Sequence, residues 1–462
     1  MKLADAGIRE HLTLALAAFA VLFACDKPAR AICDVGPAVQ ENKKEVLAPA
    51  GPDGVYRDRL GNGMSVLLYP SDTADRVALV MLYTIGEDHD PARKSGLSHL
   101  TEHLYVTAAA GETPARTARD FLQKYPNAWN ASTGSDHSVF ATVFGRDQVE
   151  AELKEAAARM GRLRVTEADL NREKPRLLEE VGNMFGAFPQ LAVVNHARER
   201  VRPLGDGHRK GGLPAHVQRI TLEDVKDWWS RHYKPVNATL VLAGAIDPKE
   251  ARKLIARHFA AIRGGEKPPA PRKPGPPKSG PVENVPINSI LPGVQAQACI
   301  AFRAPEPGSK HYAPCVLAIN RMWMRSAMGG RSVRVTFNLL DDPTFIAVST
   351  AVKPDESPKA AVGRLRSFVD QATGATLESV EKTATKNNIG VMLGAADFPD
   401  LMIQQNIYGV AFSLGRREQL GFDSKKFAER LDGLTSEDLR AAARAVFAPE
   451  RQAAVVVTPD TP

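Results

Sequence analysis

The sequence has little cysteine: the only four are Cys25, Cys33, Cys299 and Cys315. So few cysteines in a long chain exclude a scaffold held together by disulfides. Two alternatives remain open for the second half of the chain. Cys299 and Cys315 form one disulfide, or they are two separate buried thiols.

The sequence also lacks a strong excess of one charge. Lys and Arg number 60 against 53 Asp and Glu, and the net charge of +7 is too small to indicate nucleic-acid binding. We find no G-x-x-x-x-G-K-[ST] segment and no convincing G-x-G-x-x-G fingerprint, so nothing indicates a nucleotide site. With 44% apolar and 24% charged residues, the composition is typical of globular proteins, and 462 residues suggest two to four domains.

The clearest apolar run, Leu12 to Ala24, is too short for a membrane-spanning helix but suits the core of a signal peptide. Two processing routes stay open. Leu22-Phe-Ala-Cys25 resembles a lipobox, and Ala29-Arg-Ala31 resembles an ordinary cleavage site. We therefore expect residues 1–31 to be a signal peptide or lipoprotein leader. The mature chain would be periplasmic or otherwise exported, and one form would be a bacterial lipoprotein anchored to the inner membrane at Cys25. A buried N-terminal helix is the alternative.

A proline- and glycine-rich stretch divides the chain, because residues 264–281 cannot hold a helix or an inner strand. We expect a linker at 264–285 between an N-terminal domain at 32–263 and a C-terminal domain at 286–458. The two halves carry a repeat. Thr221 and Thr435 each begin a helical pattern that leads, through a proline, into an apolar strand. This offset of 214 residues indicates two domains of one α+β fold.

The chemistry-bearing motif is His99-Leu-Thr-Glu102-His103. On a helix, His99 and His103 project from one face one turn apart, so both rings can reach one zinc ion. Glu102 can reach a zinc-bound water without binding the metal and can take its proton. The alternative is a pair of solvated helix histidines.

A catalytic zinc site needs a third protein ligand, and residues 173–180 offer several acids. Glu173 and Glu180 are seven residues apart and share one helix face if Pro175 lies in the first turn. Glu179 points about 100° away from Glu180.

These motifs resemble the M16 metallopeptidases, which include pitrilysin, insulysin and the mitochondrial processing peptidase. In that family, H-x-x-E-H is followed about 75 residues later by two glutamates seven apart. The resemblance implies one Zn²⁺ per chain, held by His99, His103 and Glu180, with Glu179 as the alternative third ligand. It implies that Glu102 is the catalytic base and Glu173 the acid that supports the site.

Two more segments agree with the resemblance. His232 to Gly244 matches a Y-x-P-x-N-x-x-L-x-x-x-G segment. Residues 130–140 resemble the family's N-A-x-T…D-H-T-x-Y segment, which leads into an edge strand where substrate backbone adds as a further strand. The resemblance therefore implies a substrate-binding role for four consecutive residues: Asn130, Ala131, Ser132 and Thr133.

The resemblance implies an α+β fold with two homologous domains, each a mixed β-sheet covered by helices, which together form half of a clamshell. The implied function is a zinc-dependent endopeptidase that hydrolyses extended, unstructured peptides in an enclosed chamber. Active single-chain members supply an arginine and a tyrosine from the second domain. Here the corresponding stretch has Arg331 and Arg334 but no tyrosine in register.

We interpret both arginines as surface residues, and we expect a homologous, zinc-free partner chain to supply the missing groups. A homodimer is the second alternative. A non-proteolytic M16-type assembly or peptide-binding subunit is the alternative function.

Overall fold

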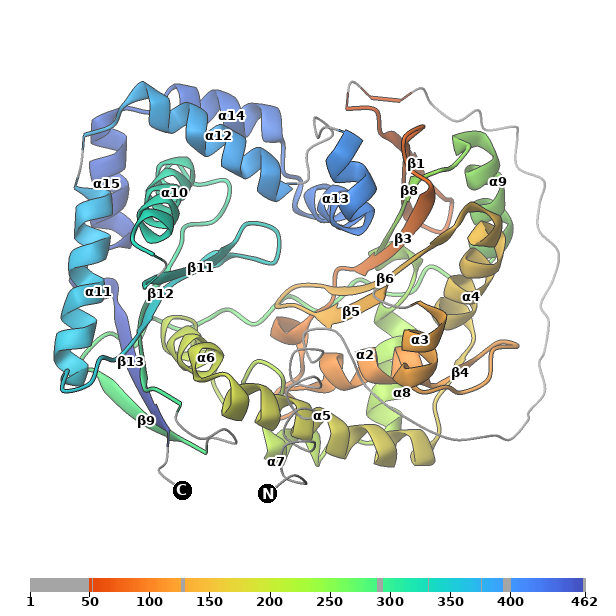
Figure 1. Ribbon diagram of the computed structural model, residues 1–462. Coiled ribbons are helices and arrows are strands. Elements are labelled where there is room, and N and C mark those ends of the chain that lie inside the picture. Colours follow the sequence, from red (N-terminus) through yellow and green to blue (C-terminus); the bar gives the residue numbers. More distant parts are fainter. Residues whose placement is uncertain are drawn as a thin grey trace, which may run out of the picture. The chain divides into compact units, whose positions relative to one another are not determined.

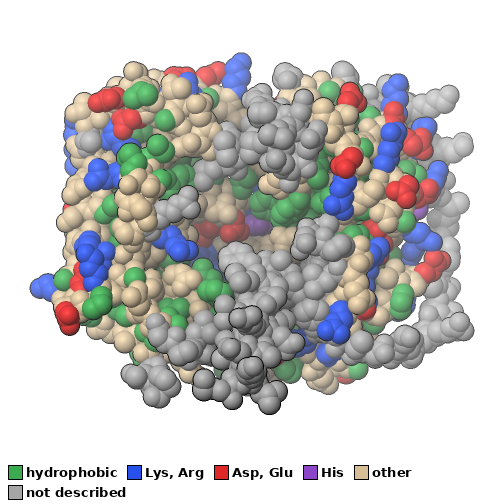
Figure 2. All heavy atoms as spheres, in the orientation of Figure 1, with side chains coloured by type: hydrophobic (Ala, Val, Ile, Leu, Met, Phe, Trp, Pro, Cys, Tyr) green, Lys and Arg blue, Asp and Glu red, His purple; other side chains and the backbone are tan. Residues whose placement is uncertain are grey.

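The computed structural model describes residues 50–51, 53–125, 129–288, 294–330, 332–374, 376–393 and 400–459. The expected leader, with Cys25 and Cys33, and the candidate Arg331 lie outside the described residues. Within those ranges, no helix combines the length and apolar character that crossing a membrane requires. On the face drawn in Figure 2, basic and acidic side chains are interspersed.

The chain divides into two compact units that do not follow the order of the sequence. One unit contains the described residues up to Leu178, together with Gly211–Pro271 and Leu393–Leu420. The other contains Glu179–Lys210, Arg272–Met392 and the described residues from Gly421 onward. The boundary between Leu178 and Glu179 falls inside helix α5 (Glu167–Ala187), so one helix belongs to both.

The first unit is built on a mixed sheet with the strand order β1-β2-β8-β3-β6-β5. Strands β2 and β8 are parallel, and the other neighbours are antiparallel. Strands β1 and β2 form a hairpin around Gly61-Asn62-Gly63. The strands are β1 (Tyr56–Arg59), β2 (Ser65–Pro70), β3 (Arg76–Tyr83), β5 (Trp129–Thr133), β6 (Ser138–Gly145) and β8 (Ala238–Gly244), and β4 (Ala109–Ala110) pairs with β7 (Leu163–Arg164) outside this sheet.

Helices cover both faces of this sheet (Figure 1). Successive strand residues face opposite sides. Leu82 on β3 faces Gly415 of α13, whereas Met81 faces the side of α4. The helices of the first unit are α2 (Leu97–Thr107), α3 (Ala118–Lys124), α4 (Val149–Gly161), α7 (Pro214–Val217), α8 (Leu222–His232), α9 (Pro248–Phe259) and α13 (Asp400–Leu420), which is kinked at Asn406.

The second unit has a mixed sheet with the strand order β11-β12-β10-β13-β9, in which β13 and β9 are parallel. Its strands are β9 (Glu283–Ile287), β10 (Gln297–Arg303), β11 (Arg334–Asn338), β12 (Asp342–Ala351) and β13 (Ala453–Pro459). Its helices are α6 (Pro189–Val201), α10 (Tyr312–Met328), α11 (Pro358–Thr373), α12 (Ser379–Leu393), α14 (Ser424–Asp432) and α15 (Ser436–Val446).

The two sheets have exchanged one covering helix. Helix α6 comes from the first half of the sequence, yet its Val193 and Ala197 pack into the core of the second sheet beside Val455. Helix α13 comes from the second half, yet it packs on β8 and β3 of the first sheet. Each sheet is therefore completed by a helix from the other half of the chain.

The predicted repeat is present in both units. Thr221 and Thr435 are N-caps whose hydroxyls each accept a bond from the N–H of an aspartate three residues later. The helices they begin, α8 and α15, lead through a short proline-started turn into β8 and β13. The expected fold class, two similar units of mixed sheet and helices, is confirmed.

The expected linker, residues 264–285, contains no helix, and strand β9 begins within it at Glu283. The stretch is hydrogen-bonded to each unit in turn. The N–H of Glu266 donates to the Arg231 carbonyl, and farther along the N–H of Gly275 donates to the Pro203 carbonyl. Whether 32–263 and 286–458 act as separate domains remains a prediction.

Candidate metal centre

Helix α2 is fixed at its start by Asp90, a buried acid in the preceding loop. The N–H groups of Gly96 and Ser98 donate to its carboxylate at 2.8 and 2.9 Å, and Ser98 Oγ donates at 2.6 Å. Burial raises the pKa of Asp90 to about 7, although the bonds from Ser98 oppose that change. Gly96 has a φ of 95°, and a Cβ there would lie 3.0 Å from the Cα of Gly212, so this position requires glycine.

The two histidines of α2 lie next to each other, with ring centres 4.8 Å apart and ring planes at 84°. Nδ1 of His99 lies 3.2 Å from the carbonyl oxygen of Gly211. Nδ1 of His103 lies 3.6 Å from Oε2 of Glu173. An oxygen near Nδ1 of each ring favours the tautomer that leaves Nε2 for a metal.

Helix α5 brings the third candidate ligand to these rings. His99, His103 and Glu180 each offer an atom such that all three atoms lie within 4.8 Å of one another. Glu179 is exposed and is not part of this group. From the sequence, Pro175 was expected to lie in the first turn of the helix that contains Glu173 and Glu180. This expectation is wrong, because Pro175 lies well inside α5.

Glu173 lies one side-chain layer behind the metal candidates and is completely buried. Arg172 donates to its carboxylate at 2.9 Å, and Arg176 donates at 3.3 Å. Burial alone would raise the pKa of Glu173. The interaction with His103 and the two arginines outweighs burial, so the pKa lies below its usual value. Glu173 is therefore held as a carboxylate beside His103.

Glu102, the expected base, is buried on α2 with only 6% of its surface exposed. Oγ1 of Thr133 donates a hydrogen bond of 2.8 Å to Oε2 of Glu102. From the sequence, Thr133 was expected to contact the substrate, but in the structure its side chain bonds to Glu102. The bond joins the end of β5 to the middle of α2.

The four expected substrate-binding residues lie on β5, which pairs with β6 and ends the first sheet. The side chains alternate in direction. Thr133 faces α2, whereas Nδ2 of Asn130 donates to the Tyr408 hydroxyl of α13 at 2.8 Å. Beyond β5, Arg416 of α13 binds both oxygens of Asp136 at 2.8 and 3.0 Å. Helix α13 therefore holds the strand near both of its ends.

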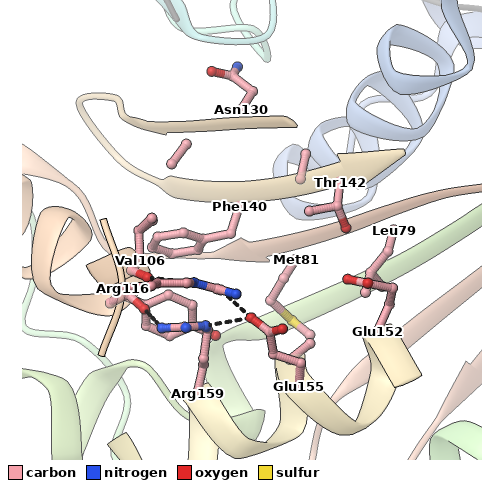
Figure 3. A pocket seen from close by; sticks show the side chains of 14 residues that line it. Leu79, Met81, Val106, Arg116, Asn130, Phe140, Thr142, Glu152, Glu155 and Arg159 are labelled. Atoms are coloured by element: carbon pink, nitrogen blue, oxygen red, sulfur yellow. Dashed lines mark hydrogen bonds and ion pairs between the residues drawn. The ribbon is translucent and has the colours of Figure 1, made fainter. Parts of the chain in front are cut away.

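A pocket partly open to solvent lies beside β5 and is also lined by residues of α2 and α4 (Figure 3). Its lining is mostly apolar and includes Phe140 and Met81. At its base, Arg116 and Arg159 both bind Glu155, with Arg159 Nε at 3.0 Å from the carboxylate. These three charged residues are therefore paired with one another, and the fourth charged lining residue, Glu152, pairs with Lys124 outside the pocket.

The donor set fits zinc. Two imidazoles and one carboxylate are a combination that catalytic zinc sites use, with a fourth position left for water or substrate. The imidazoles, the carboxylate and the acid behind His103 supply the ligand chemistry and the supporting contact that such sites need. The roles of His99, His103 and Glu180 remain a prediction, but the structure brings the three together.

Reasoning from the sequence missed three contributors to the site. Asp90 could have been found as an acid six residues before the glycine that opens the helix. No sequence signal connects Tyr408 or Arg416 to β5, because each contact spans about 280 residues.

Arg334 lies exposed at the start of β11. Cys299 and Cys315 are free and buried, and burial raises the pKa of both thiols above the usual value.

Comparisons with known proteins all find similarity to M16-type proteins. A model described as "Peptidase M16 inactive domain" matches residues 219–322, a segment that includes neither α2 nor α5. The zinc protease PqqE of Helicobacter pylori is 24% identical over 222 residues, which is 46% of this chain and 48% of that protein. Core protein I of the ubiquinol-cytochrome-c reductase complex of Euglena gracilis is 22% identical, over 49% of this chain and 45% of that protein. The chain thus spans about half the length of these curated relatives.

Solved structures show the same fold. A protease from Helicobacter pylori superimposes with a TM-score of 0.69 at 18% identity, covering 88% of this chain and 99% of that one. The periplasmic protease PqqL of Escherichia coli gives a TM-score of 0.63 at 15% identity, covering 89% of this chain and 48% of that one.

Proposed function

We propose that this chain, which belongs to the M16 peptidase family, is a zinc-dependent endopeptidase that hydrolyses extended, unstructured peptides. The observation that carries the proposal is the group formed by His99, His103 and Glu180, whose ligand atoms lie within 4.8 Å of one another. Glu102 is on the same helix as both histidines. The proposal thus assigns the metal ligands and the base to one pair of helices, α2 and α5.

His99, His103 and Glu180 would hold one zinc ion, with Glu173 fixing the His103 ring from behind. A bound zinc ion would supply a Lewis acid for the scissile carbonyl and would lower the pKa of a water molecule to about 7. The Glu102 carboxylate would accept a proton from the attacking water and donate it to the nitrogen of the leaving amine. Because Glu102 is buried, bulk water would not compete for that proton.

Strand β5 would bind the substrate backbone. An edge strand offers unpaired N–H and C=O groups, and an extended peptide can add to it through main-chain hydrogen bonds. The backbone of Asn130 to Thr133 would make these bonds, and the pocket beside β5 would receive one substrate side chain. This mode of binding selects extended chains and excludes peptides that are already folded.

We propose further that full activity needs a homologous partner subunit, with a homodimer as the alternative. The stretch that resembles the family's arginine and tyrosine segment has no tyrosine, and Arg334 is exposed. Removing one group that stabilises the developing oxyanion typically lowers kcat by about 10²- to 10³-fold. The H. pylori and E. coli proteins named above are proteases, and the E. coli protein is periplasmic, which supports an exported enzyme.

A non-proteolytic assembly or peptide-binding subunit is the second candidate. Two observations favour it: the family model that matches is that of an inactive domain, and one relative is a core protein of a respiratory complex. That candidate gives no reason for the His99, His103 and Glu180 group to be intact.

The deciding experiment measures metal content and cleavage of a quenched, unstructured peptide library by the wild type and by Glu102→Gln. Each protein is assayed alone and with any homologue that co-purifies. We expect about one zinc per chain in both proteins and a loss of activity of about 10²-fold or more in Glu102→Gln, because general bases contribute that much.

Activity only with the homologue would support the partner proposal. Zinc without cleavage under either condition would favour the assembly subunit. A wild type without zinc would overturn the metal site itself.

A further inference from the structure

Thr133 occupies an unusual place, at the point where the substrate strand and the helix of the base meet. Its hydroxyl donates to Oε2 of Glu102 at 2.8 Å. Asn130, on the opposite face of β5, makes a different contact, because its side chain donates to the hydroxyl of Tyr408 on α13. Among the four residues expected to contact substrate, Thr133 is the one whose side chain bonds to the expected base.

We propose that Thr133 is a positioning residue for Glu102, an inference that rests on the proposed peptidase function. A glutamate side chain has three rotatable bonds, and the last of them is only weakly confined. A bond to Oε2 restricts the rotation of the carboxylate that Glu102 would present to the attacking water. Thr133 therefore acts through Glu102 and does not itself touch the reacting atoms.

The donor itself is held in place from several directions. Thr133 pairs with Ser138 across the turn between β5 and β6, and the N–H of Gly134 closes that turn on the carbonyl of His137 at 2.8 Å. Ser138 in turn donates to the carbonyl of Ile85 at 2.8 Å. A positioning group acts only if its own geometry is restrained, and these contacts provide the restraint.

The bond from Thr133 to Glu102 also limits what the Thr133 hydroxyl can do for a substrate. The hydroxyl of Thr133 is committed to one carboxylate oxygen of Glu102. The same hydroxyl cannot also donate to a substrate, because it has a single proton. The side chain of Thr133 would therefore affect turnover, while the backbone of β5 would affect binding.

The test compares Thr133→Val, which keeps the shape and removes the hydroxyl, with Thr133→Ser, which keeps the hydroxyl. We expect Thr133→Val to lower kcat by about 10- to 100-fold with KM and zinc affinity unchanged, as for other groups that orient a catalytic side chain. Thr133→Ser should stay within about threefold of the wild type. Thr107→Val is the matched control, because its buried hydroxyl bonds only to the carbonyl of His103, at 2.8 Å.

A double variant separates positioning from a general loss of structure. Because Thr133 acts through Glu102, Thr133→Val should cause no further loss in a Glu102→Gln background. An equal further loss in that background would overturn the proposal, as would a raised KM with normal kcat or a Thr133→Ser as slow as Thr133→Val. Thr133→Ala takes the place of Thr133→Val if the latter does not fold.

A structural readout keeps the inference separate from the proposed function. Crystal structures of zinc-free wild type and Thr133→Val would compare the Glu102 carboxylate directly. We expect it to rotate or become disordered in the variant, and an unchanged carboxylate would overturn the inference. If the wild type neither binds zinc nor cleaves peptides, the proposed function fails, and the crystal structures alone decide whether Thr133 orients Glu102.

Discussion

At the scale of single residues, the candidate site depends on contacts between residues that are far apart in the sequence, such as Thr133 and Glu102. The H-x-x-E-H spacing and the two glutamates seven apart were readable, because helix geometry places i and i+4, or i and i+7, on one face. The sequence did not predict which atoms form contacts. The bond from Thr133 to Glu102 and the bonds to Asp90 depend on how a strand and a loop pack against α2.

Glu173 offers a prediction at this scale. Replacing it with glutamine keeps the shape but removes the charge that faces His103 and pairs with Arg172 and Arg176. We expect Glu173→Gln to weaken zinc binding by about 10- to 100-fold, since groups that orient metal ligands contribute that much. Competition with a chromogenic chelator measures the affinity.

Glu180→Gln and Glu179→Gln provide the comparison, because the two residues are adjacent on α5. Glu180→Gln should abolish tight zinc binding, and the exposed Glu179 should tolerate the change. An unchanged affinity in Glu180→Gln with a loss in Glu179→Gln would reverse the choice of third ligand.

At the scale of elements, α13 is the feature that sequence patterns did not reveal. Its buried face contains Val410, Ala411 and Leu414, a spacing that predicts a helix with one apolar side. The pattern does not say which sheet that side covers. The hairpin of β1 and β2 and the capped helices α8 and α15 were predictable, since their contacts lie within a few residues of each other.

The contact between α13 and the first sheet is close at Gly415. A Cβ at this position would lie 2.2 Å from Cδ1 of Leu82 and 2.9 Å from Cγ2 of Val241. We expect Gly415→Ala to lower the free energy of unfolding by about 1–3 kcal/mol, because inserting a methyl group into a packed core forces neighbours to move. Urea denaturation followed by fluorescence measures the change.

Gly363→Ala is the matched control, because Gly363 also lies inside a helix, α11, and nothing lies within 4 Å of its added Cβ. There the same substitution should raise the free energy of unfolding by about 0.5–1 kcal/mol, since alanine favours the helix. Equal effects at the two glycines would contradict the close packing of α13.

At the scale of the whole molecule, the exchange of α6 and α13 joins the two halves of the sequence. The family resemblance predicted two similar α+β domains, and the fold agrees. It could not predict the exchange, because each exchanged helix is separated from its sheet by many residues and a single sequence holds no record of such long-range packing.

Cutting the chain in its proline-rich stretch tests this feature. We introduce a specific protease site at the exposed residues 269–271 and cleave the folded protein. We expect the two fragments to elute together in size-exclusion chromatography and to separate only in denaturant, since α6 and α13 each remain packed on the other fragment's sheet. Fragments that elute separately in native buffer would contradict the exchange.

The place of α13 in the chain has a consequence for the timing of synthesis. All strands of the first sheet have been synthesised by Gly244. The face of that sheet that α13 covers stays uncovered until Leu420 has been made. At about 5–20 residues per second, the ribosome needs roughly 9–35 s to pass from residue 244 to residue 420. During that interval the apolar face of β3 and β8 has no cover from its own chain. A nascent chain that stalls before Leu420 would therefore expose an apolar surface of the kind that chaperones bind.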